Sequence, residues 1–307
     1  MLNKKILNHQ RFYILAVSGG PDSMFLLDNF RQRQYKFAVA HVNYHKREES
    51  YQDEKLVKGY CKTWNLPCFI CSVEPGEHSS AKNFQAWARE KRYNFFQKIA
   101  QQNKTRYIIT AHHLDDHLET YLLQKQKKSL VEYWGLSPKT RWKNIHILRP
   151  LIHLEKKQIY QYLKRNKIPY ILDQTNYLPI YQRNIVRQKI INSPVEEKEQ
   201  LLKEIKQKNQ ALYQTKLLLK KQIKEAIFNS TLNLNTWASN SFELKMRLLY
   251  YWINKSTDQE FVNRKKNILL ETKKQLESPK KNLMIVLNKN YQVKKNYPWA
   301  NIENISL

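Results

Sequence analysis

Glycine is scarce in this sequence, with 5 residues in 307, and cysteine is scarcer still. The three cysteines, Cys61, Cys68 and Cys71, cannot pair off completely, which argues against a disulfide-stapled secreted domain and for a reducing compartment. Apolar runs such as 12–17 and 283–287 fall far short of the roughly 20 residues that a membrane span needs. The start, MLNKKILNHQ, has no apolar core of a secretory signal. The sequence therefore predicts a globular, cytoplasmic protein with no membrane partner.

Acidic residues are also in short supply, 26 Asp and Glu against 54 Lys and Arg, which gives a formal net charge of +28. Such an excess is typical of proteins that bind polyanions, and it favours a nucleic acid as partner. A coding bias toward lysine and asparagine would raise the charge without any partner, and lysines on helix surfaces are commonly only solvated. With 41% hydrophobic residues, the chain still has enough apolar material for a core.

Short apolar runs alternate with longer amphipathic segments in the first half of the chain. Five runs rich in β-branched and aromatic residues are predicted strands, and four segments between them are predicted helices. Strand–helix alternation of this kind builds a doubly wound parallel sheet with helices on both faces, so the predicted fold class is α/β. The strands are 12–17, 37–42, 68–73, 106–111 and 145–151, and the helices are 22–33, 50–65, 81–102 and 114–128.

The hydrophobic pattern changes in the second half of the chain. Between residues 195 and 228 there is no Gly or Pro, and apolar side chains recur every seven residues at Ile205, Leu212 and Leu219, which predicts one long amphipathic helix. Beyond it, two helical segments and a hairpin are expected at 241–253, about 261–276 and 282–295. The predicted organisation is a catalytic domain at 1–194, a long linking helix at 195–228, and a small, basic, mostly helical domain at 229–307.

Two of the five glycines lie in SGGPDS, residues 18–23, directly after the first predicted strand and at the start of the first helix. Adjacent glycines let backbone N–H groups approach a phosphate, serine hydroxyls add donors, and a helix N-terminus favours an anion. Asp22 is unusual in such a loop, because a carboxylate repels phosphates unless Mg²⁺ lies between them. No Gly-Lys-Ser/Thr follows, so this is not a Walker A loop. The alternative is an ordinary Gly-Gly turn with an Asp or Ser cap.

A second polar cluster, AHHLDDHLET at 111–120, follows the fourth predicted strand, and His41 lies at the end of the second. Ligands of open α/β sheets bind beyond the carboxyl ends of the strands, so these clusters should share one edge with the loop. Asp116 and Glu119 stand three residues apart on the opening turn of a helix and share a face, whereas Asp115 is the expected N-cap. The histidines and carboxylates could also hold a metal, but they lack the i, i+4 histidine pair of H-E-x-x-H zinc sites.

SGGPDS in this position resembles the pyrophosphate-binding loop of the N-type ATP pyrophosphatases, the PP-loop enzymes. Taken with AHHLDDHLET, it resembles the tRNA(Ile)-lysidine synthases, in their shorter form with one C-terminal domain. The resemblance covers roughly residues 12–190, and the ensemble is more specific than any one piece. Two departures are His117, where the family usually has Gln, and the absence of a Gly-rich segment after Thr120. The other matching segments are HVNYHKREES (41–50), AREKRY (88–93), RPL (149–151), DQTN (173–176) and YQRNIVR (181–187).

The resemblance implies a ligase that uses ATP and Mg²⁺ to attach free L-lysine to C2 of the wobble cytidine in the CAU anticodon of tRNA(Ile). The reaction runs through an adenylated cytidine and releases AMP and pyrophosphate. The product, lysidine, changes decoding from AUG to AUA and charging from Met to Ile. The partners implied are therefore tRNA(Ile) and free lysine, and the C-terminal domain is expected to bind the tRNA. The oligomeric state stays open, with a homodimer as one option.

The resemblance also implies roles for single residues. Arg92 would neutralise charge that develops on the phosphate or the base, and His112 would orient one of them. Asp116 and Glu119 would hold the lysine amine, and one carboxylate must accept its proton before attack, because the amine is almost entirely protonated at pH 7. Arg92, and likewise Arg183 and Arg187, could instead be solvated residues on the surface of basic helices. The catalytic set is Asp22, Arg92, His112, Asp116 and Glu119; the ATP-binding set is Ser18, Gly19, Gly20, Pro21, Asp22 (also the Mg²⁺ ligand), Ser23, Ala40, His41 and Ala111; the tRNA-binding set is Arg183, Arg187, Lys125, Lys127 and Lys128.

Two alternatives remain open. A tRNA-thiolating enzyme would share the SGGxDS loop, but its sulfur-carrying cysteines are expected near the start of the helix after the third strand, where 78–83 has none. A non-catalytic RNA-binding relative would have lost its ATP site, whereas the 18–23 loop, Asp116 and Glu119 are intact here. Pyrophosphate release that depends on both RNA and lysine separates these possibilities from lysidine synthesis.

Overall fold

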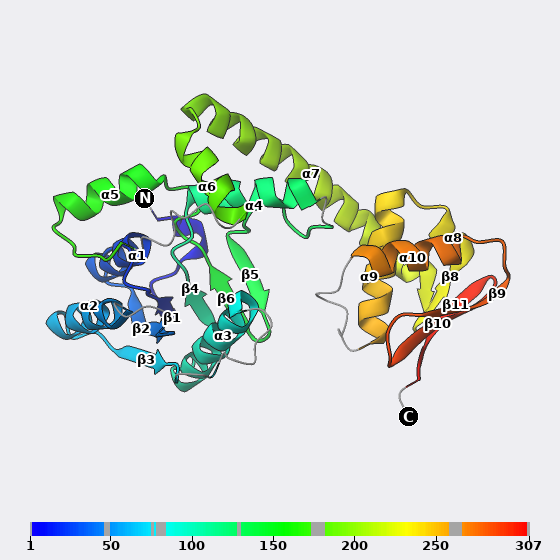
Figure 1. Cartoon of the computed structure of the whole chain (residues 1–307), viewed down its shortest axis with the longest axis horizontal. Coiled ribbons are helices and arrows are strands. Elements are labelled where there is room, and N and C mark those ends of the chain that lie inside the picture. Colours follow the sequence, from blue (N-terminus) through cyan, green and yellow to red (C-terminus); the bar gives the residue numbers. More distant parts are fainter. Residues whose placement is uncertain are drawn as a thin grey trace. The chain divides into compact units, whose positions relative to one another are not determined.

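Figure 1 shows a computed structural model of the chain, which describes residues 2–45, 50–74, 77, 84–127, 130–172, 182–257 and 266–305. The chain forms two compact units. The first comprises Met1–Gln126 and Trp134–Leu202, and the second comprises Lys127–Tyr133 and Lys203–Leu307. The polypeptide therefore passes from one unit to the other three times, after residues 126, 133 and 202.

A six-stranded sheet in the order β3-β2-β1-β4-β6-β5 forms the centre of the first unit. Five strands run parallel, and β5 joins the edge antiparallel to β6. β2 lies on one side of β1 and β4 on the other, so the order of strands reverses beside β1, where open sheets of this class bind ligands. The strands are β1 (Phe12–Ala16), β2 (Lys36–Asn43), β3 (Cys68–Ser72), β4 (Tyr107–Ile109), β5 (Lys139–Trp142) and β6 (Ile145–Leu148).

Helices cover both faces of this sheet, which explains why its central strands are apolar throughout. Tyr13 and Leu15 of β1 pack on the side of α1, α2 and α5, whereas Ile14 packs on the side of α3. The α/β fold class predicted from the sequence is confirmed. The helices of this unit are α1 (Pro21–Gln32), α2 (Ser50–Thr63), α3 (Phe84–Gln102), α4 (Leu114–Lys127), α5 (Lys156–Arg165), α6 (Gln182–Asn192) and the first turns of α7 (Val195–Ala226), with a short 3-10 helix at Lys4–Ile6.

The five predicted strands and the four predicted helices of this unit are all present, with ends shifted by a few residues. Residues 81–83, at the expected start of α3, lie outside the described part of the chain. β5 is the strand that the sequence pattern does not predict. Its sequence, KTRW, exposes Lys139 and Arg141 on an edge of the sheet, so it contains no apolar run.

A buried carboxylate ties α1 to α2 and α5. The side chain of Asp28 is completely buried, and it accepts hydrogen bonds from the hydroxyls of Tyr60 and Tyr162, each at 2.6 Å. Nη2 of Arg31 lies 2.7 Å from the same carboxylate. Burial and these hydrogen bonds raise the pKa of both tyrosines, which keeps the hydroxyl protons on the donors. The cluster fixes the direction of α1, whose first turn carries the SGGPDS loop.

The second unit contains a five-stranded sheet in the order β7-β8-β11-β10-β9, and every pair of neighbouring strands is antiparallel. One face packs on helices around a core that includes Trp237, Leu248, Trp252 and Val293. The sheet is larger than the hairpin expected from the sequence, because β11 and the two short strands β7 and β8 extend it. The elements are β7 (Ile227–Phe228), β8 (Thr231–Asn233), α8 (Leu234–Ala238), α9 (Phe242–Ser256), α10 (Lys266–Leu276), β9 (Asn282–Val286), β10 (Tyr291–Asn296) and β11 (Trp299–Asn304).

The segment after α4 also belongs to the second unit. Nη2 of Arg247, a buried residue of α9, donates to the carbonyl of Val131 at 3.0 Å. Lys216 of α7 pairs with the carboxylate of Glu132 at 2.9 Å. In the described part of the chain, none of the helices has the length and hydropathy that crossing a bilayer would require.

Candidate functional site

A pocket of about 280 Å³ opens beyond the carboxyl ends of β1, β2 and β4. Its wall includes most residues of the predicted catalytic and ATP-binding sets, which come together from four separate parts of the chain. Gly19, Pro21, His41 and Glu119 are close in sequence to lining residues but do not themselves line it. The predicted residues on the wall are Ser18, Gly20, Asp22, Ser23, Ala40, Arg92, Ala111, His112 and Asp116, and they are joined by Tyr44, Tyr93, Phe96 and Thr110, which the sequence reasoning missed.

The SGGPDS loop forms the turn between β1 and α1. Gly19 has a φ of +91°, and a Cβ there would lie 3.1 Å from Oδ1 of Asp53, so this position requires glycine. Ser23 Oγ donates to the carbonyl of Gly20 at 2.9 Å and accepts from the backbone N–H of Ser18 at 3.1 Å. Pro21 is the first residue of α1, where a missing N–H costs nothing. The loop therefore presents a helix N-terminus, with its positive potential, to the pocket.

His41 lies inside the core rather than on the pocket wall. Its Nδ1 is 2.9 Å from the carbonyl oxygen of Val17, the residue just before the loop. Burial lowers the pKa of this histidine, so the ring is neutral at pH 7 and Nδ1–H donates to the carbonyl. The side chain fixes the junction of β1 with the loop.

The N-terminus of α4 is capped by His113. Its Nδ1 accepts from the backbone N–H of Asp115 at 3.2 Å, and Oδ2 of Asp116 accepts from the backbone N–H of His113 at 2.9 Å. The expectation that Asp115 is the N-cap is wrong, because the helix begins at Leu114, one residue earlier. The Asp115 carboxylate instead lies 4.0 Å from Nζ of Lys198.

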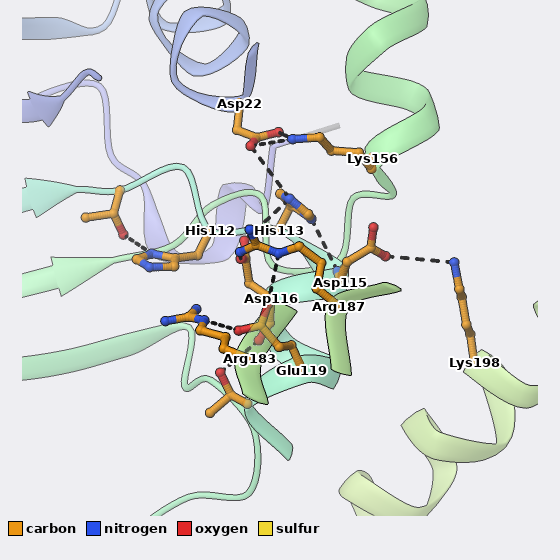
Figure 2. Close-up of polar contacts among 12 residues, drawn as sticks. Asp22, His112, His113, Asp115, Asp116, Glu119, Lys156, Arg183, Arg187 and Lys198 are labelled. Carbon is orange, nitrogen blue, oxygen red and sulfur yellow. Dashed lines mark hydrogen bonds and ion pairs between the residues drawn. The ribbon is translucent and has the colours of Figure 1, made fainter. Parts of the chain in front are cut away.

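The same cap directs the His113 ring toward two carboxylates. Because Nδ1 accepts a hydrogen bond, the ring proton is on Nε2. This nitrogen lies 3.5 Å from Oδ2 of Asp116 and 3.7 Å from Oδ2 of Asp22 (Figure 2). His113 thus joins the SGGPDS end of the site to the α4 end.

Asp22 has a cationic partner that the sequence reasoning missed. Nζ of Lys156, the first residue of α5, lies 2.6 Å from both carboxylate oxygens of Asp22, across 134 residues of sequence (Figure 2). No local motif marks this lysine, since the pairing depends on how α5 packs beside α1.

Asp116 and Glu119 share a face of α4, and two arginines of α6 reach them (Figure 2). The Glu119 side chain is only 2% exposed; Arg183 pairs with its Oε1, and Nε of Arg187 lies 3.2 Å from its Oε2. Burial raises the pKa of Glu119, and the two arginines oppose this only in part. Burial acts in the same direction on Asp116, but His113, His112 and Arg187 outweigh it and lower its pKa to about 2. The site therefore pairs a permanently ionised carboxylate with one that holds a proton more readily.

Arg183 and Arg187 were expected to contact tRNA, and in the structure both are engaged with Glu119. Lys125 and Lys127 are exposed near the end of α4, and Lys128 lies outside the described residues. Of the segments that carry the family resemblance, 46–49, 173–176 and Tyr181 are likewise outside them. A contact of these residues with tRNA stays a prediction.

His112 is neutral at physiological pH. Burial, together with the charges of Arg149, Arg92 and Arg183, lowers its pKa to about 4, although Asp116 opposes them. Its Nδ1 lies 2.9 Å from Oγ1 of Thr110. The side chain can therefore donate or accept a hydrogen bond in the pocket without carrying charge.

Two residues of the resembling segments have structural explanations. Arg149, from RPL, is buried and donates to the carbonyl of Ser137 at 2.7 Å and to Oγ1 of Thr140 at 3.1 Å, which holds β5 against β6. His117, where the family usually has Gln, accepts from the backbone N–H of Leu136 at 2.9 Å. Its ring packs so closely that a Cβ on Gly135 would lie 2.6 Å from Cε1. The chain after α4 is thus anchored by an imidazole.

The described part of the site offers few side chains that could bind a metal ion. Among the residues that the structure describes, no group of three His, Cys, Asp or Glu side chains is placed to hold an ion. Mg²⁺ bound to nucleotide phosphates needs only one or two carboxylates, so Asp22 fits that use. None of the three free cysteines lines the pocket, and Cys68 and Cys71 lie within β3.

Comparison with known proteins connects this geometry to a family. Residues 1–194 match the sequence profile of the PP-loop domain. A protein named tRNA(Ile)-lysidine synthase from Mycoplasma mycoides subsp. mycoides is 34% identical over 295 residues, which cover 95% of this chain and 73% of that protein. A protein of the same name from Mycoplasma pneumoniae is 38% identical over 213 residues, covering 69% and 73%. The U34-tRNA thiolase NcsA from Methanococcus maripaludis superposes with a TM-score of 0.56 over 68% of this chain and 75% of that chain, and at 12% identity this shows the fold alone.

Proposed function

Because this chain belongs to the tRNA(Ile)-lysidine synthases of the PP-loop family, we propose that it attaches lysine to C2 of the wobble cytidine in the CAU anticodon of tRNA(Ile). Cytidine O2 attacks the α-phosphate of ATP and expels pyrophosphate, and the lysine ε-amine then displaces AMP. The observation that carries the proposal is that the SGGPDS loop and Asp116 of α4 line one pocket, with Glu119 on the same face of α4 as Asp116.

The loop end of the pocket suits the triphosphate. The N–H groups at the start of α1 and the hydroxyls of Ser18 and Ser23 would hold the leaving pyrophosphate. Asp22 would bind Mg²⁺, which would neutralise the phosphates when present. Tyr44 and Phe96 give the pocket an apolar wall for a base, and the Tyr44 hydroxyl is held by the carbonyl of Ala88 at 2.7 Å.

The α4 end of the site suits a free amino acid that carries both charges. Asp116, with a pKa of about 2, offers a fixed negative charge to the ε-ammonium. Glu119 is the better proton acceptor of the two, because burial raises its pKa. Arg183 and Arg187 bring positive charge to the same place, where the α-carboxylate of lysine would be complemented.

Arg92 and His112 also line the pocket. A guanidinium there would stabilise negative charge that develops on the transferred phosphate. The neutral imidazole of His112 would orient the cytosine or the phosphate by a hydrogen bond, without adding charge.

The remaining basic surface is assigned to tRNA. A net charge of +28 supports binding to phosphates, and Lys125 and Lys127 are exposed near the end of α4. We assign residues 1–194 to catalysis, 195–228 to the connection, and 229–307 to tRNA binding.

Transfer of radiolabelled lysine tests the function directly. The purified chain is incubated with ATP, Mg²⁺, labelled lysine and a transcript of tRNA(Ile) bearing CAU, and an elongator methionine tRNA with the same anticodon serves as control. Label is expected in the isoleucine tRNA alone. Pyrophosphate release with RNA but without lysine transfer would contradict the proposal and point to adenylation for another nucleophile, such as a sulfur donor. Tight tRNA binding with no turnover would leave a binding protein.

A further inference from the structure

Asp22, at the SGGPDS end of the site, is paired with a lysine that lies outside every motif of the sequence. Lys156 places its ammonium 2.6 Å from each oxygen of the Asp22 carboxylate, and Asp22 is itself on the pocket wall (Figure 2). The lysine therefore lies beside the SGGPDS loop, of which Asp22 is part. That loop contains no lysine of its own, whereas a Walker A loop supplies one to the β- and γ-phosphates.

The pairing of Lys156 with Asp22 is easily exchanged for another. Their side chains are 28% and 26% exposed, so water reaches both. Water that reaches the pair screens the two charges and weakens the attraction between them. A lysine also keeps a flexible four-carbon stem and three donors, which lets it follow an oxygen that moves or is replaced.

A phosphate in the pocket would change the balance of charge around Asp22. Its oxygens repel the carboxylate, and a divalent cation between them would take over the carboxylate oxygens that now bind Lys156. The released ammonium would then pair with the phosphate oxygens, which offer it charge-assisted hydrogen bonds.

We propose that Lys156 is a phosphate-binding residue of this site, which turns from Asp22 to the pyrophosphate portion of ATP when Mg²⁺ engages Asp22. The inference rests on the proposed function for the identity of the nucleotide, but it requires only that a pyrophosphate binds at the loop. Lys156 thus supplies from α5 the cation that the loop lacks. Without nucleotide, Asp22 and Lys156 neutralise each other. With Mg²⁺ and nucleotide bound, Mg²⁺ neutralises Asp22 and the phosphates neutralise Lys156.

Calorimetric titration of the full chain with pyrophosphate tests this without any turnover. With Mg²⁺, Lys156→Met should weaken pyrophosphate binding at least tenfold and leave AMP binding within twofold of wild type. Lys156→Arg, which keeps the charge, should recover most of the affinity. Lys157→Met is the matched control, because it removes the same charge from the next, exposed residue and should bind both probes like wild type.

A second comparison isolates the exchange of partners. Without Mg²⁺, Asp22→Asn frees the ammonium and should bind pyrophosphate several-fold more tightly than wild type, and the gain should vanish in the double variant with Lys156→Met. Equal loss of pyrophosphate and AMP binding in Lys156→Met would overturn the proposal and leave Lys156 a tether between α5 and α1. Unchanged pyrophosphate binding would overturn it as well.

These readouts separate the two proposals. A chain that transfers no lysine but binds pyrophosphate through Lys156 would refute the proposed function and uphold this inference. If the wild-type chain transfers lysine but Lys156→Met binds pyrophosphate as tightly as wild type, the proposed function is upheld and this inference is refuted.

Discussion

Nε of Arg187 lies 3.2 Å from Oε2 of Glu119, a carboxylate that has almost no contact with solvent. The same guanidinium reaches within 3.9 Å of Oδ1 of Asp116, so one side chain of α6 bridges two of the three carboxylates of α4. A buried charge is tolerated only when it is paired, and here the pairing also fixes the spacing of the two acids. The arginine therefore prepares a site with two negative charges of different proton affinity.

Asp116→Asn should impair the use of lysine more than the use of ATP. The substitution removes a negative charge but keeps the shape of the side chain, so the lost interaction with the ε-ammonium should raise KM for lysine roughly 10- to 100-fold, as expected for a charge-assisted hydrogen bond. Lysine transfer at varied lysine and fixed ATP measures this, and nucleotide binding should stay within about threefold of wild type.

The neighbouring acid provides the control for that variant. Asp115→Asn removes the same charge one residue away, from a carboxylate that faces Lys198 at 4.0 Å rather than the pocket. It should leave KM for lysine unchanged. An equal effect of both variants would mean that only the total charge of α4 matters.

The stability of the protein should fall as the pH is lowered from 6.5 toward 4. Burial lowers the pKa of both His112 and His117 to about 4, whereas an unfolded chain takes up their protons near 6.5. Between these values the unfolded state binds more protons than the folded state, so stability is lost as pH falls. Asp116, whose pKa is lowered to about 2, acts in the same direction but mainly below this window, because the unfolded chain takes up its proton only near pH 4. Urea unfolding at pH 7.0 and 4.5 measures the effect.

His117→Gln isolates one of the two histidines. Glutamine can accept a hydrogen bond from the Leu136 N–H but does not titrate. Between pH 7.0 and 4.5 the free energy of unfolding should therefore fall by about 1–3 kcal/mol less in the variant than in wild type. Parallel pH profiles for the two proteins would show that this imidazole is protonated as easily in the folded as in the unfolded chain.

Two glycines should respond in opposite directions to alanine. Gly135 has a φ of +75°, and a Cβ there would meet the His117 ring at 2.6 Å, so Gly135→Ala should destabilise the protein by about 2–4 kcal/mol. Gly59 lies within α2 with nothing within 4 Å of its Cβ position, so Gly59→Ala should stabilise by about 0.5–1 kcal/mol. Chemical denaturation of both variants checks the pair, and a tolerated alanine at 135 would mean that the loop moves away from the ring.

The sequence is most informative where the chain is buried on both sides. Tyr13, Ile14 and Leu15 are all inaccessible because helices cover both faces of β1, and this produces the contiguous apolar run that predicts a strand. β5 faces solvent at an edge and alternates charged with uncharged residues, so nothing in its composition distinguishes it from a loop.

The candidate site divides in the same way. Its local parts, the SGGPDS loop and the carboxylates of α4, were predictable because neighbours in sequence must share a turn or a helix face. Lys156 was not predictable, because its contact with Asp22 depends on how α5 packs beside α1. The two residues are 134 positions apart in the sequence. The sequence favours Asp115 as the cap of α4 because aspartate is a preferred N-cap residue, and only the geometry shows that His113 takes this position.

The interleaving of the two units has a consequence for cutting the chain. The second unit includes 127–133, so a fragment that begins at Lys203 lacks the Val131 carbonyl to which the buried Arg247 donates. A single protease cut within α7 would leave that segment on the N-terminal product. During synthesis, too, the segment leaves the ribosome long before its partners, and the second unit is complete only once the C-terminal residues have emerged. Neither unit consists of one uninterrupted stretch of polypeptide, so any single fragment that contains one unit whole also carries residues of the other.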